Sequence, residues 1–249
     1  MITKEIILEG IPFTVYQRKE IKPKRLLFFF HGFTGERHSG IGERAAALTE
    51  IGFLVIAGDA YLHGERSPEF FAAWDNARKH CDIINIIIRT AKEIKYLYHK
   101  YFKNYSDIKT FPVYAYGVSM GAATAFYLTS IMEEVNSLVS ILGSPSFCDF
   151  YELKQQLYGF NRDDYFLINL QSYREEDPLL NYHRLKGKNI FMTGGTEDKI
   201  VPMVYSKQLN EKLKNEKVIF KAYNTGHMST AEMLEDSYNF LKNRLAQDE

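Results

Sequence analysis

Apolar runs and amphipathic stretches alternate along the chain and predict the order of its strands and helices. Apolar strands recur near residues 26–30, 53–58, 111–116, 137–142, 189–193 and 218–223. Apolar positions at helical spacing fill the intervals near 40–51, 74–103, 120–131, 202–215 and 229–246. Strands that alternate with helices form a mostly parallel sheet with helices on both faces. We therefore predict an α/β fold built on one central sheet.

The first residues follow a different pattern, in which polar and apolar positions alternate. Residues 4–9 and 11–18 have this alternation, which is typical of strands with one exposed face. We expect them to form an antiparallel hairpin at the sheet edge. The chain shows no internal repeat or linker, and 45% of its residues are hydrophobic, enough for one large core. We therefore predict a single domain over residues 1–249.

A glycine-flanked serine follows the predicted strand at 111–116. The motif Gly117-Val118-Ser119-Met120-Gly121 lies between that strand and the helix expected at 120–131. A sharp strand-to-helix turn of this composition, the nucleophile elbow, lifts the serine Oγ clear of the backbone. Glycine is needed on both sides because a side chain would collide with the neighbouring strand or helix. The alternative is a glycine-rich turn in which Ser119 only caps the next helix.

An acid and a histidine follow the serine in the order that this elbow requires. Asp198 lies on the loop after the strand at 189–193, and His227 lies on the loop after the strand at 218–223. Both positions are at carboxyl ends of strands, where an open α/β sheet places its functional groups. Glu197 is a second candidate acid, but a shift of one residue would turn its carboxylate away from His227. We predict Ser119, Asp198 and His227 as a catalytic triad.

Two backbone N–H groups are predicted to stabilise the oxyanion of such a reaction. One belongs to Met120, directly after the nucleophile, and the other to Phe33, on the loop after the strand at 26–30. Donors of this kind contribute roughly 3–4 kcal/mol each in other enzymes. His31 precedes this loop and could be a second base, although a histidine before glycine at a strand end more often orders the loop by hydrogen bonds.

Together these motifs resemble the α/β-hydrolase superfamily over nearly the whole chain, from about residue 26 to residue 245. Within it the chain resembles small bacterial carboxylesterases related to dienelactone hydrolases and to the catalytic domain of prolyl oligopeptidases. The segments Asp59-Ala60-Tyr61-Leu62-His63-Gly64 and 193–202 carry this closer resemblance. It implies an α/β-hydrolase fold with a mostly parallel sheet and helices on both faces. Dienelactone hydrolases themselves carry cysteine as nucleophile, whereas this chain has Ser119.

One interval is too long for the regular alternation of strands and helices. Between the strands at 137–142 and 189–193 lie about 45 residues, where one helix would suffice. Residues 145–186 contain nine aromatic side chains: Phe147, Phe150, Tyr151, Tyr158, Phe160, Tyr165, Phe166, Tyr173 and Tyr182. We predict a small helical cap that roofs the active site and supplies an apolar wall. The alternative is an insertion that covers the sheet edge with a small core of its own.

Further residues near the predicted strand ends are candidate substrate contacts. Tyr61 and His63 follow the strand at 53–58, and Met228 follows His227. For His63 a structural hydrogen bond is the competing interpretation. The sequence has no metal-binding motif and no phosphate-binding loop, so we expect neither metal nor cofactor.

Charge and composition limit the partners. The formal net charge is zero, which gives no electrostatic reason to expect a nucleic-acid or membrane partner. The start of the chain lacks the pattern of a secretory signal, and the two cysteines form no metal-type spacing, so we expect a cytoplasmic protein. Nothing in the sequence predicts the oligomeric state.

The resulting hypothesis is a serine hydrolase, and first of all a carboxylesterase. We expect it to cleave small to medium, uncharged acyl esters through an acyl-enzyme on Ser119. A peptidase, an amidase or a thioesterase of the same superfamily is the alternative. A binding module that keeps the fold without the chemistry is a third possibility, although every triad position is filled.

Overall fold

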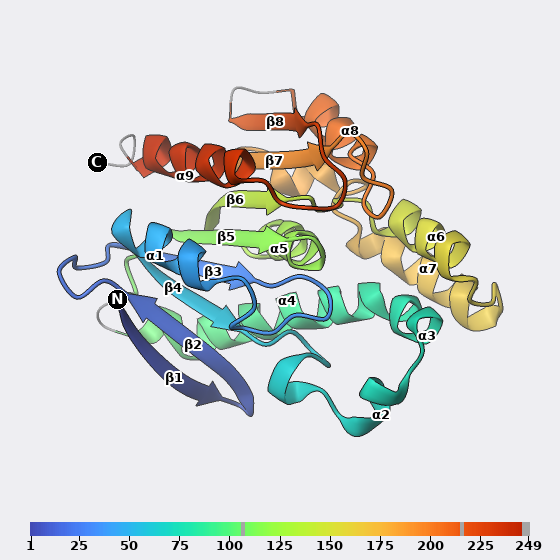
Figure 1. Cartoon of the computed structure of the whole chain (residues 1–249), viewed down its shortest axis with the longest axis horizontal. Helices are drawn as coiled ribbons and strands as arrows, with labels where there is room; N and C mark the ends of the chain where they lie inside the picture. Colours follow the sequence, from blue (N-terminus) through green and yellow to red (C-terminus); the bar gives the residue numbers. More distant parts are fainter. Residues whose placement is uncertain (106–107, 215–216, 246–249) are drawn as a thin grey trace.

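Eight strands form one sheet in the computed structural model, which describes residues 1–105, 108–214 and 217–245 (Figure 1). The strands are β1 (Ile2–Leu8), β2 (Ile11–Gln17), β3 (Arg25–Phe30), β4 (Phe53–Gly58), β5 (Val113–Val118), β6 (Val135–Ile141), β7 (Asn189–Gly195) and β8 (Val218–Tyr223). Their order across the sheet is β1-β2-β4-β3-β5-β6-β7-β8. Strands β3 to β8 are mutually parallel, so their carboxyl ends share one edge.

The N-terminal hairpin extends the sheet at one side, as the alternation of its residues predicts. β1 pairs with β2 in antiparallel register from Ile2 opposite Gln17 to Leu8 opposite Ile11, and β2 pairs antiparallel with β4. The side chains of β1 are mostly exposed because it is an edge strand. The predicted mostly parallel sheet with an antiparallel edge hairpin is confirmed.

Helices cover both faces of the sheet. They are α1 (Gly42–Glu50), α2 (Glu69–Ala73), α3 (Asn76–Cys81), α4 (Ile83–Lys100), α5 (Met120–Ile131), α6 (Phe147–Tyr158), α7 (Asp164–Glu176), α8 (Val204–Leu213) and α9 (Ala231–Leu245), with short 3₁₀ turns η1 (Gly64–Arg66), η2 (Phe102–Asn104) and η3 (Tyr182–Leu185). Helices α1 and α9 pack on one face, and α4, α5 and α8 pack on the other. Alternate side chains of each central strand therefore enter two separate cores.

One predicted helix and one predicted strand differ most from the structure. The single helix expected at 74–103 is wrong, because this stretch breaks into α3, α4 and the turn η2. Trp74 has an extended backbone, and the side chain of Asp75 accepts a hydrogen bond from Arg78 N–H and so starts α3. A second break falls at Asp82, between α3 and α4. Strand β5 begins at Val113 rather than 111 and includes Gly117 and Val118, because these pair with β3 and β6.

Two predicted helices keep their place with shorter ends. Helix α8 lies within the predicted 202–215 and α9 within 229–246. Residues 215 and 246 of those predictions lie outside the described residues. Among the described residues, no helix combines the length and apolarity needed to cross a bilayer.

The segment 145–186 forms a helical hairpin beyond the carboxyl ends of the strands. Figure 1 shows α6 and α7 side by side next to α3, away from the body of the sheet. The two helices share an aromatic cluster, in which the ring of Tyr151 stacks on Phe166 with centroids 4.8 Å apart and meets Tyr173 edge-on at 5.1 Å. These rings belong to the same buried cluster as α4 and α5, so the insertion extends that core and, among the described residues, has no separate one.

A buried carboxylate joins the two ends of this hairpin. One oxygen of Asp177 accepts hydrogen bonds from the N–H groups of Phe147 and Cys148 at the start of α6, at 2.8 and 2.9 Å. Its other oxygen accepts from the N–H groups of Leu179 and Leu180 at 2.8 and 3.0 Å. The carboxylate thus ties the start of α6 to the chain that leaves α7.

A buried arginine holds the loop after β3 against the end of β4. The guanidinium of Arg37 donates to Asp59 at 2.8 Å, and Arg37 N–H donates to the other oxygen of the same carboxylate at 2.7 Å. Arg37 is 5% exposed and Asp59 is 1% exposed. Glu5 and Glu65 accept further bonds from the guanidinium. This network fixes the loop that carries Phe33.

We predict that Arg37→Met lowers the free energy of unfolding by about 3 kcal/mol, because it leaves the buried Asp59 carboxylate without its ionic partner. Urea denaturation measures the change. Arg18→Met is the matched control, since Arg18 pairs with the exposed Glu50 at the surface and its loss should cost less than about 1 kcal/mol. Equal losses in the two variants would contradict a special role for the Arg37 pair.

Candidate active site

The serine of the glycine motif occupies a strained turn between β5 and α5. Ser119 has φ 56° and ψ −118°, a region that non-glycine residues rarely adopt. Its N–H donates to the carbonyl of Ile141 on β6 at 2.9 Å, which holds the turn at the edge of the sheet. Helix α5 begins at the next residue, so the Ser119 side chain stands at the helix N-terminus beside the carboxyl ends of the strands.

The two glycines of the motif allow backbones to approach closely. A Cβ on Gly117 would lie 2.1 Å from the carbonyl oxygen of Gly121, and a Cβ on Gly121 would lie 2.2 Å from that of Phe30. Such distances are shorter than any non-bonded contact, so only glycine fits at either position. The first contact lets α5 turn back on β5, and the second lets α5 pack against the end of β3.

The three residues predicted as a triad are hydrogen-bonded to one another. Ser119 Oγ lies 2.8 Å from His227 Nε2, and His227 Nδ1 lies 2.7 Å from Asp198 Oδ2. An ionised carboxylate only accepts hydrogen bonds, so Nδ1 carries the proton and Nε2 is free to accept from the Ser119 hydroxyl. Residues 108 positions apart in sequence therefore form one continuous chain of hydrogen bonds.

Both oxygens of the Asp198 carboxylate form hydrogen bonds. Its second oxygen accepts from the N–H groups of Ile200 and Val201, each at 2.9 Å. Burial raises its pKa, but the hydrogen bonds from His227 and from Val201 N–H outweigh burial and bring the pKa below its usual value. The carboxylate is therefore ionised at neutral pH. Glu197, the alternative acid, is exposed, and its N–H donates to Thr225 in the loop of His227.

Two backbone N–H groups next to Ser119 have no acceptor in the part of the chain that the structure describes. Met120 is the first residue of α5, where N–H groups have no intrahelical partner. Phe33 follows Gly32 in a turn that the bond from Gly35 N–H to the Gly32 carbonyl closes at 3.0 Å. These are the two donors that the sequence predicts for an oxyanion.

Both ring nitrogens of His31 are engaged in ordering this loop. Nδ1 donates to the carbonyl of Gly32 at 2.8 Å, and Nε2 accepts from Ala60 N–H at 3.0 Å. Burial lowers the pKa of His31, so the ring stays neutral. The arrangement favours a loop-ordering role for His31 over a second base.

A cavity of about 550 Å³ opens in front of Ser119 and His227. Loops at the carboxyl ends of the strands form one side, and α3 and α6 form the other. Its lining residues are Gly32, Phe33, Thr34, Asn76, His80, Ile83, Val118, Ser119, Met120, Leu142, Phe150, Lys154, Tyr158, Ile200, Val201, His227, Met228 and Ser229. The insertion predicted as a cap therefore contributes part of the cavity wall.

Of the three predicted substrate contacts, Met228 lines the cavity, and Tyr61 and His63 do not. Tyr61 turns toward α4, because its N–H donates to Thr90 and the guanidinium of Arg89 covers its ring at 5.1 Å. His63 is 3% exposed, donates from Nδ1 to the carbonyl of Tyr61, and packs its ring against Phe33. Burial lowers the pKa of His63 to about 4, so it is a neutral support beneath the loop of Phe33.

Sequence reasoning missed Lys154 and His80 as cavity residues. Phe150, Lys154 and Tyr158 are spaced by four, so they share one face of α6, and this spacing was the signal available in the sequence. His80 stacks on Tyr158 with ring centroids 3.6 Å apart, and Asn76 lies one turn before it on α3. Because 74–103 was expected to be one helix, nothing placed His80 near Ser119.

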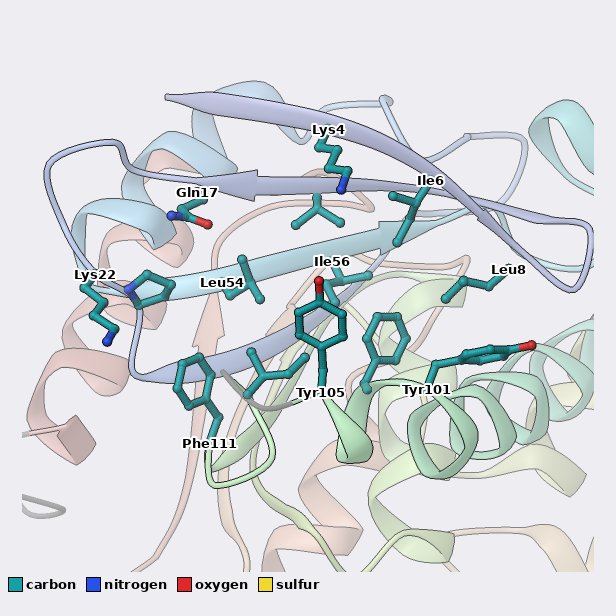
Figure 2. Close-up of a pocket in the computed structure, with 14 residues that line it drawn as sticks. Lys4, Ile6, Leu8, Gln17, Lys22, Leu54, Ile56, Tyr101, Tyr105 and Phe111 are labelled. Atoms are coloured by element: carbon teal, nitrogen blue, oxygen red, sulfur yellow. The ribbon is translucent and has the colours of Figure 1, made fainter.

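A second groove, of about 510 Å³, lies between the N-terminal hairpin and the chain after α4 (Figure 2). Figure 2 shows Lys4, Ile6 and Leu8 of β1 on one side and Tyr101, Tyr105 and Phe111 on the other. None of the predicted site residues lines it. Within residues 1–105, 108–214 and 217–245, no cluster of histidine, cysteine and carboxylate side chains could hold a metal ion.

Comparisons with known proteins place the fold and the class of this chain. The sequence profile of the dienelactone hydrolase family matches residues 13–246. The chain is 24% identical over 216 residues to YitV of Bacillus subtilis (strain 168), a protein provisionally named an esterase. The match covers 84% of this chain and 82% of YitV.

Solved structures agree on the fold. TT1662 from Thermus thermophilus superposes with a TM-score of 0.72 at 20% identity and 98% coverage of both chains. A cold-adapted esterase from an Arctic intertidal metagenomic library gives 0.66 at 16% identity, with coverage of 97% and 92%. Dienelactone hydrolase from Anabaena variabilis gives 0.62 at 16% identity, with coverage of 97% and 96%. The predicted α/β-hydrolase fold is confirmed.

We predict that Gly121→Ala lowers the free energy of unfolding by about 1–3 kcal/mol, because the new methyl group would overlap the carbonyls of Phe30 and His31. Thermal or urea unfolding measures the loss. Gly42→Ala is the control: its Cβ would meet nothing within 4 Å, and alanine at the start of α1 should leave stability unchanged or raise it by up to about 1 kcal/mol. A Gly121→Ala protein as stable as the control would disprove the close approach.

Proposed function

Because the chain belongs to the dienelactone hydrolase family and is an enzyme of the esterase class of hydrolases, we propose that it is a serine carboxylesterase whose nucleophile is Ser119. The observation that carries the proposal is the hydrogen-bonded chain from Ser119 through His227 to Asp198, at the floor of the cavity. This order of groups activates a hydroxyl for attack on a carbonyl.

In the proposed acylation step, Ser119 Oγ attacks the ester carbonyl while His227 Nε2 takes its proton. Asp198 keeps Nδ1 protonated and stabilises the imidazolium that forms. The tetrahedral intermediate then collapses, His227 gives the proton to the leaving alcohol, and the acyl group stays on Ser119. In the second step His227 takes a proton from water, which attacks the acyl carbon; the bond from that carbon to Ser119 Oγ then breaks, His227 returns the proton to Oγ, and the acid is released.

The N–H groups of Phe33 and Met120 are the proposed donors to the oxyanion. They act on the charge that develops as the carbonyl carbon becomes tetrahedral, and the loops that carry them are already held in place. The loop of Phe33 is fixed by the bond from Arg37 to Asp59 and by the bond from Ala60 N–H to His31. The N–H of Met120 is fixed by its place at the start of α5. Donors that do not have to reorient stabilise the transition state most.

The cavity supports a small or medium acyl ester as substrate. Its volume of about 550 Å³ is within the range of small-molecule sites, and Phe150 and Tyr158 of α6 supply apolar wall next to Ser119. Met228 is 67% exposed at the rim and remains a proposed substrate contact. The same machinery could attack an amide or a thioester, so turnover of p-nitrophenyl butyrate, an aminoacyl p-nitroanilide and a butyryl thioester should be compared.

We predict that Ser119→Ala keeps the fold but lowers kcat for p-nitrophenyl butyrate by roughly a thousandfold or more. Fluorophosphonate labelling, read by mass spectrometry, should modify the wild-type protein once and the variant not at all. Ser130→Ala is the control, because Ser130 lies on the same helix and its hydroxyl donates to the carbonyl of Tyr127 one turn earlier. A Ser119→Ala protein with the wild-type rate, free of host esterase, would refute the assignment.

We predict that Asp198→Asn lowers kcat by about a hundredfold to ten-thousandfold, because an amide no longer stabilises the imidazolium or the required tautomer of His227. Glu197→Gln tests the neighbouring acid and should leave kcat within about twofold, since Glu197 is exposed. Steady-state kinetics at pH 7 with p-nitrophenyl butyrate measures both. The reverse order of effects would assign the acid to Glu197.

A further inference from the structure

The cavity wall contains a buried lysine that the proposed ester hydrolysis does not use. Lys154 of α6 is 1% exposed, and its Nζ donates to the carbonyl of Ile200 at 3.0 Å. An ammonium group has three N–H donors. The other two have no acceptor in the described part of the chain. The side chain therefore has a buried positive charge and unused donors in the wall of the cavity that contains Ser119.

The neighbours of this ammonium are aromatic rings. Nζ lies 4.4 Å from the centroid of Phe150 and 5.7 Å from that of Tyr158, so both rings attract the cation through their faces. Asp198 is the carboxylate whose charge acts on Lys154, but its own oxygens are occupied by His227, Ile200 and Val201. The ammonium consequently has no carboxylate bonded to it among the described residues.

The described lining of the cavity includes a positively charged side chain and no carboxylate. Its lining in the described chain includes Lys154 but neither Asp, Glu nor Arg. Burial lowers the pKa of Lys154 to about 8 and Asp198 opposes this change, so the ammonium form predominates at pH 7. A methionine of similar length would fill the same space without the cost of burying a charge. A charge retained there suggests a ligand.

We propose that Lys154 binds an anionic group of the substrate, so that the preferred ester carries a carboxylate. This inference rests on the proposed function, and it replaces the expectation of an uncharged ester. The two unused N–H donors can form charge-assisted hydrogen bonds to a carboxylate, which are stronger than bonds between neutral groups. Phe150 and Tyr158 exclude water from the pair, which strengthens it further.

Two matched series of small esters test the inference at pH 7. The first contains monomethyl succinate, glutarate and adipate, with the carboxylate on the acyl side. The second contains the O-acetyl derivatives of glycolic, 3-hydroxypropionic and 4-hydroxybutyric acids, with the carboxylate on the alcohol side. Each carboxylate is paired with the corresponding primary amide, which has the same shape without the charge. Titration of the released acid in a pH-stat gives kcat and KM for every ester.

For at least one chain length in one series, the wild-type enzyme should hydrolyse the carboxylate about tenfold to a hundredfold better than its amide, measured as kcat/KM. Lys154→Met should remove this preference, measured as the ratio of kcat/KM for each carboxylate to kcat/KM for its amide, because this ratio cancels any effect that loss of the bond to the Ile200 carbonyl has on both substrates. Lys154→Gln keeps an uncharged donor to the Ile200 carbonyl and should lose the preference for the carboxylate as Lys154→Met does. It replaces Lys154→Met in the test if the methionine variant folds poorly. Lys154→Arg should keep part of the preference.

Two results would overturn the inference: equal use of carboxylate and amide at every chain length, or a preference that survives in both neutral variants. Hydrolysis of p-nitrophenyl butyrate by the wild-type and Ser119→Ala proteins is measured beside the two series. It distinguishes failure of the anion site from failure of the proposed esterase function. Turnover that depends on Ser119 without a carboxylate preference rejects only the anion site. Absence of turnover of any ester rejects the esterase assignment and the anion site together.

Discussion

The geometry of the candidate site depends on the close approach of backbone to backbone at Gly121. Because this residue has no side chain, α5 packs directly against the carbonyls of Phe30 and His31 at the end of β3. The contact brings the loop of Phe33 beside the first N–H of α5, and Gly117 turns the chain sharply enough to leave Ser119 between them. One steric constraint thus sets the position of Ser119 relative to the two proposed oxyanion donors.

Buried polar groups then hold the loops that this packing leaves irregular. Asp59 with Arg37 fixes the loop after β3, and Asp177 fixes the base of the α6–α7 hairpin through four N–H groups. The loops of Asp198 and His227 are joined by bonds from Thr196 and Glu197 N–H to the carbonyls of Tyr223 and Thr225. Except for the bonds that Asp177 accepts from Leu179 and Leu180, these bonds link segments far apart in sequence, so they fix the loops to one another.

Two faces of helix α6 have different environments. One face packs Tyr151 against Phe166 and Tyr173 of α7, in a cluster that is continuous with the core under α4 and α5. Another face presents Phe150, Lys154 and Tyr158 to the cavity. The bond from Lys154 to the Ile200 carbonyl joins the insertion to the loop that follows Asp198. One short insertion therefore contributes both to the core and to the wall of the cavity.

The sequence by itself determined the order of strands and helices, the sharp turn at Ser119, and the loops that carry Asp198 and His227. These features depend on local periodicity and on glycine, whose effects act over a few residues. The tertiary structure alone decided that Tyr61 and His63 turn away from the cavity and that Lys154 is buried in its wall. Those outcomes depend on which distant side chains compete for the same space and the same hydrogen-bond partners, and a single sequence does not encode that competition locally.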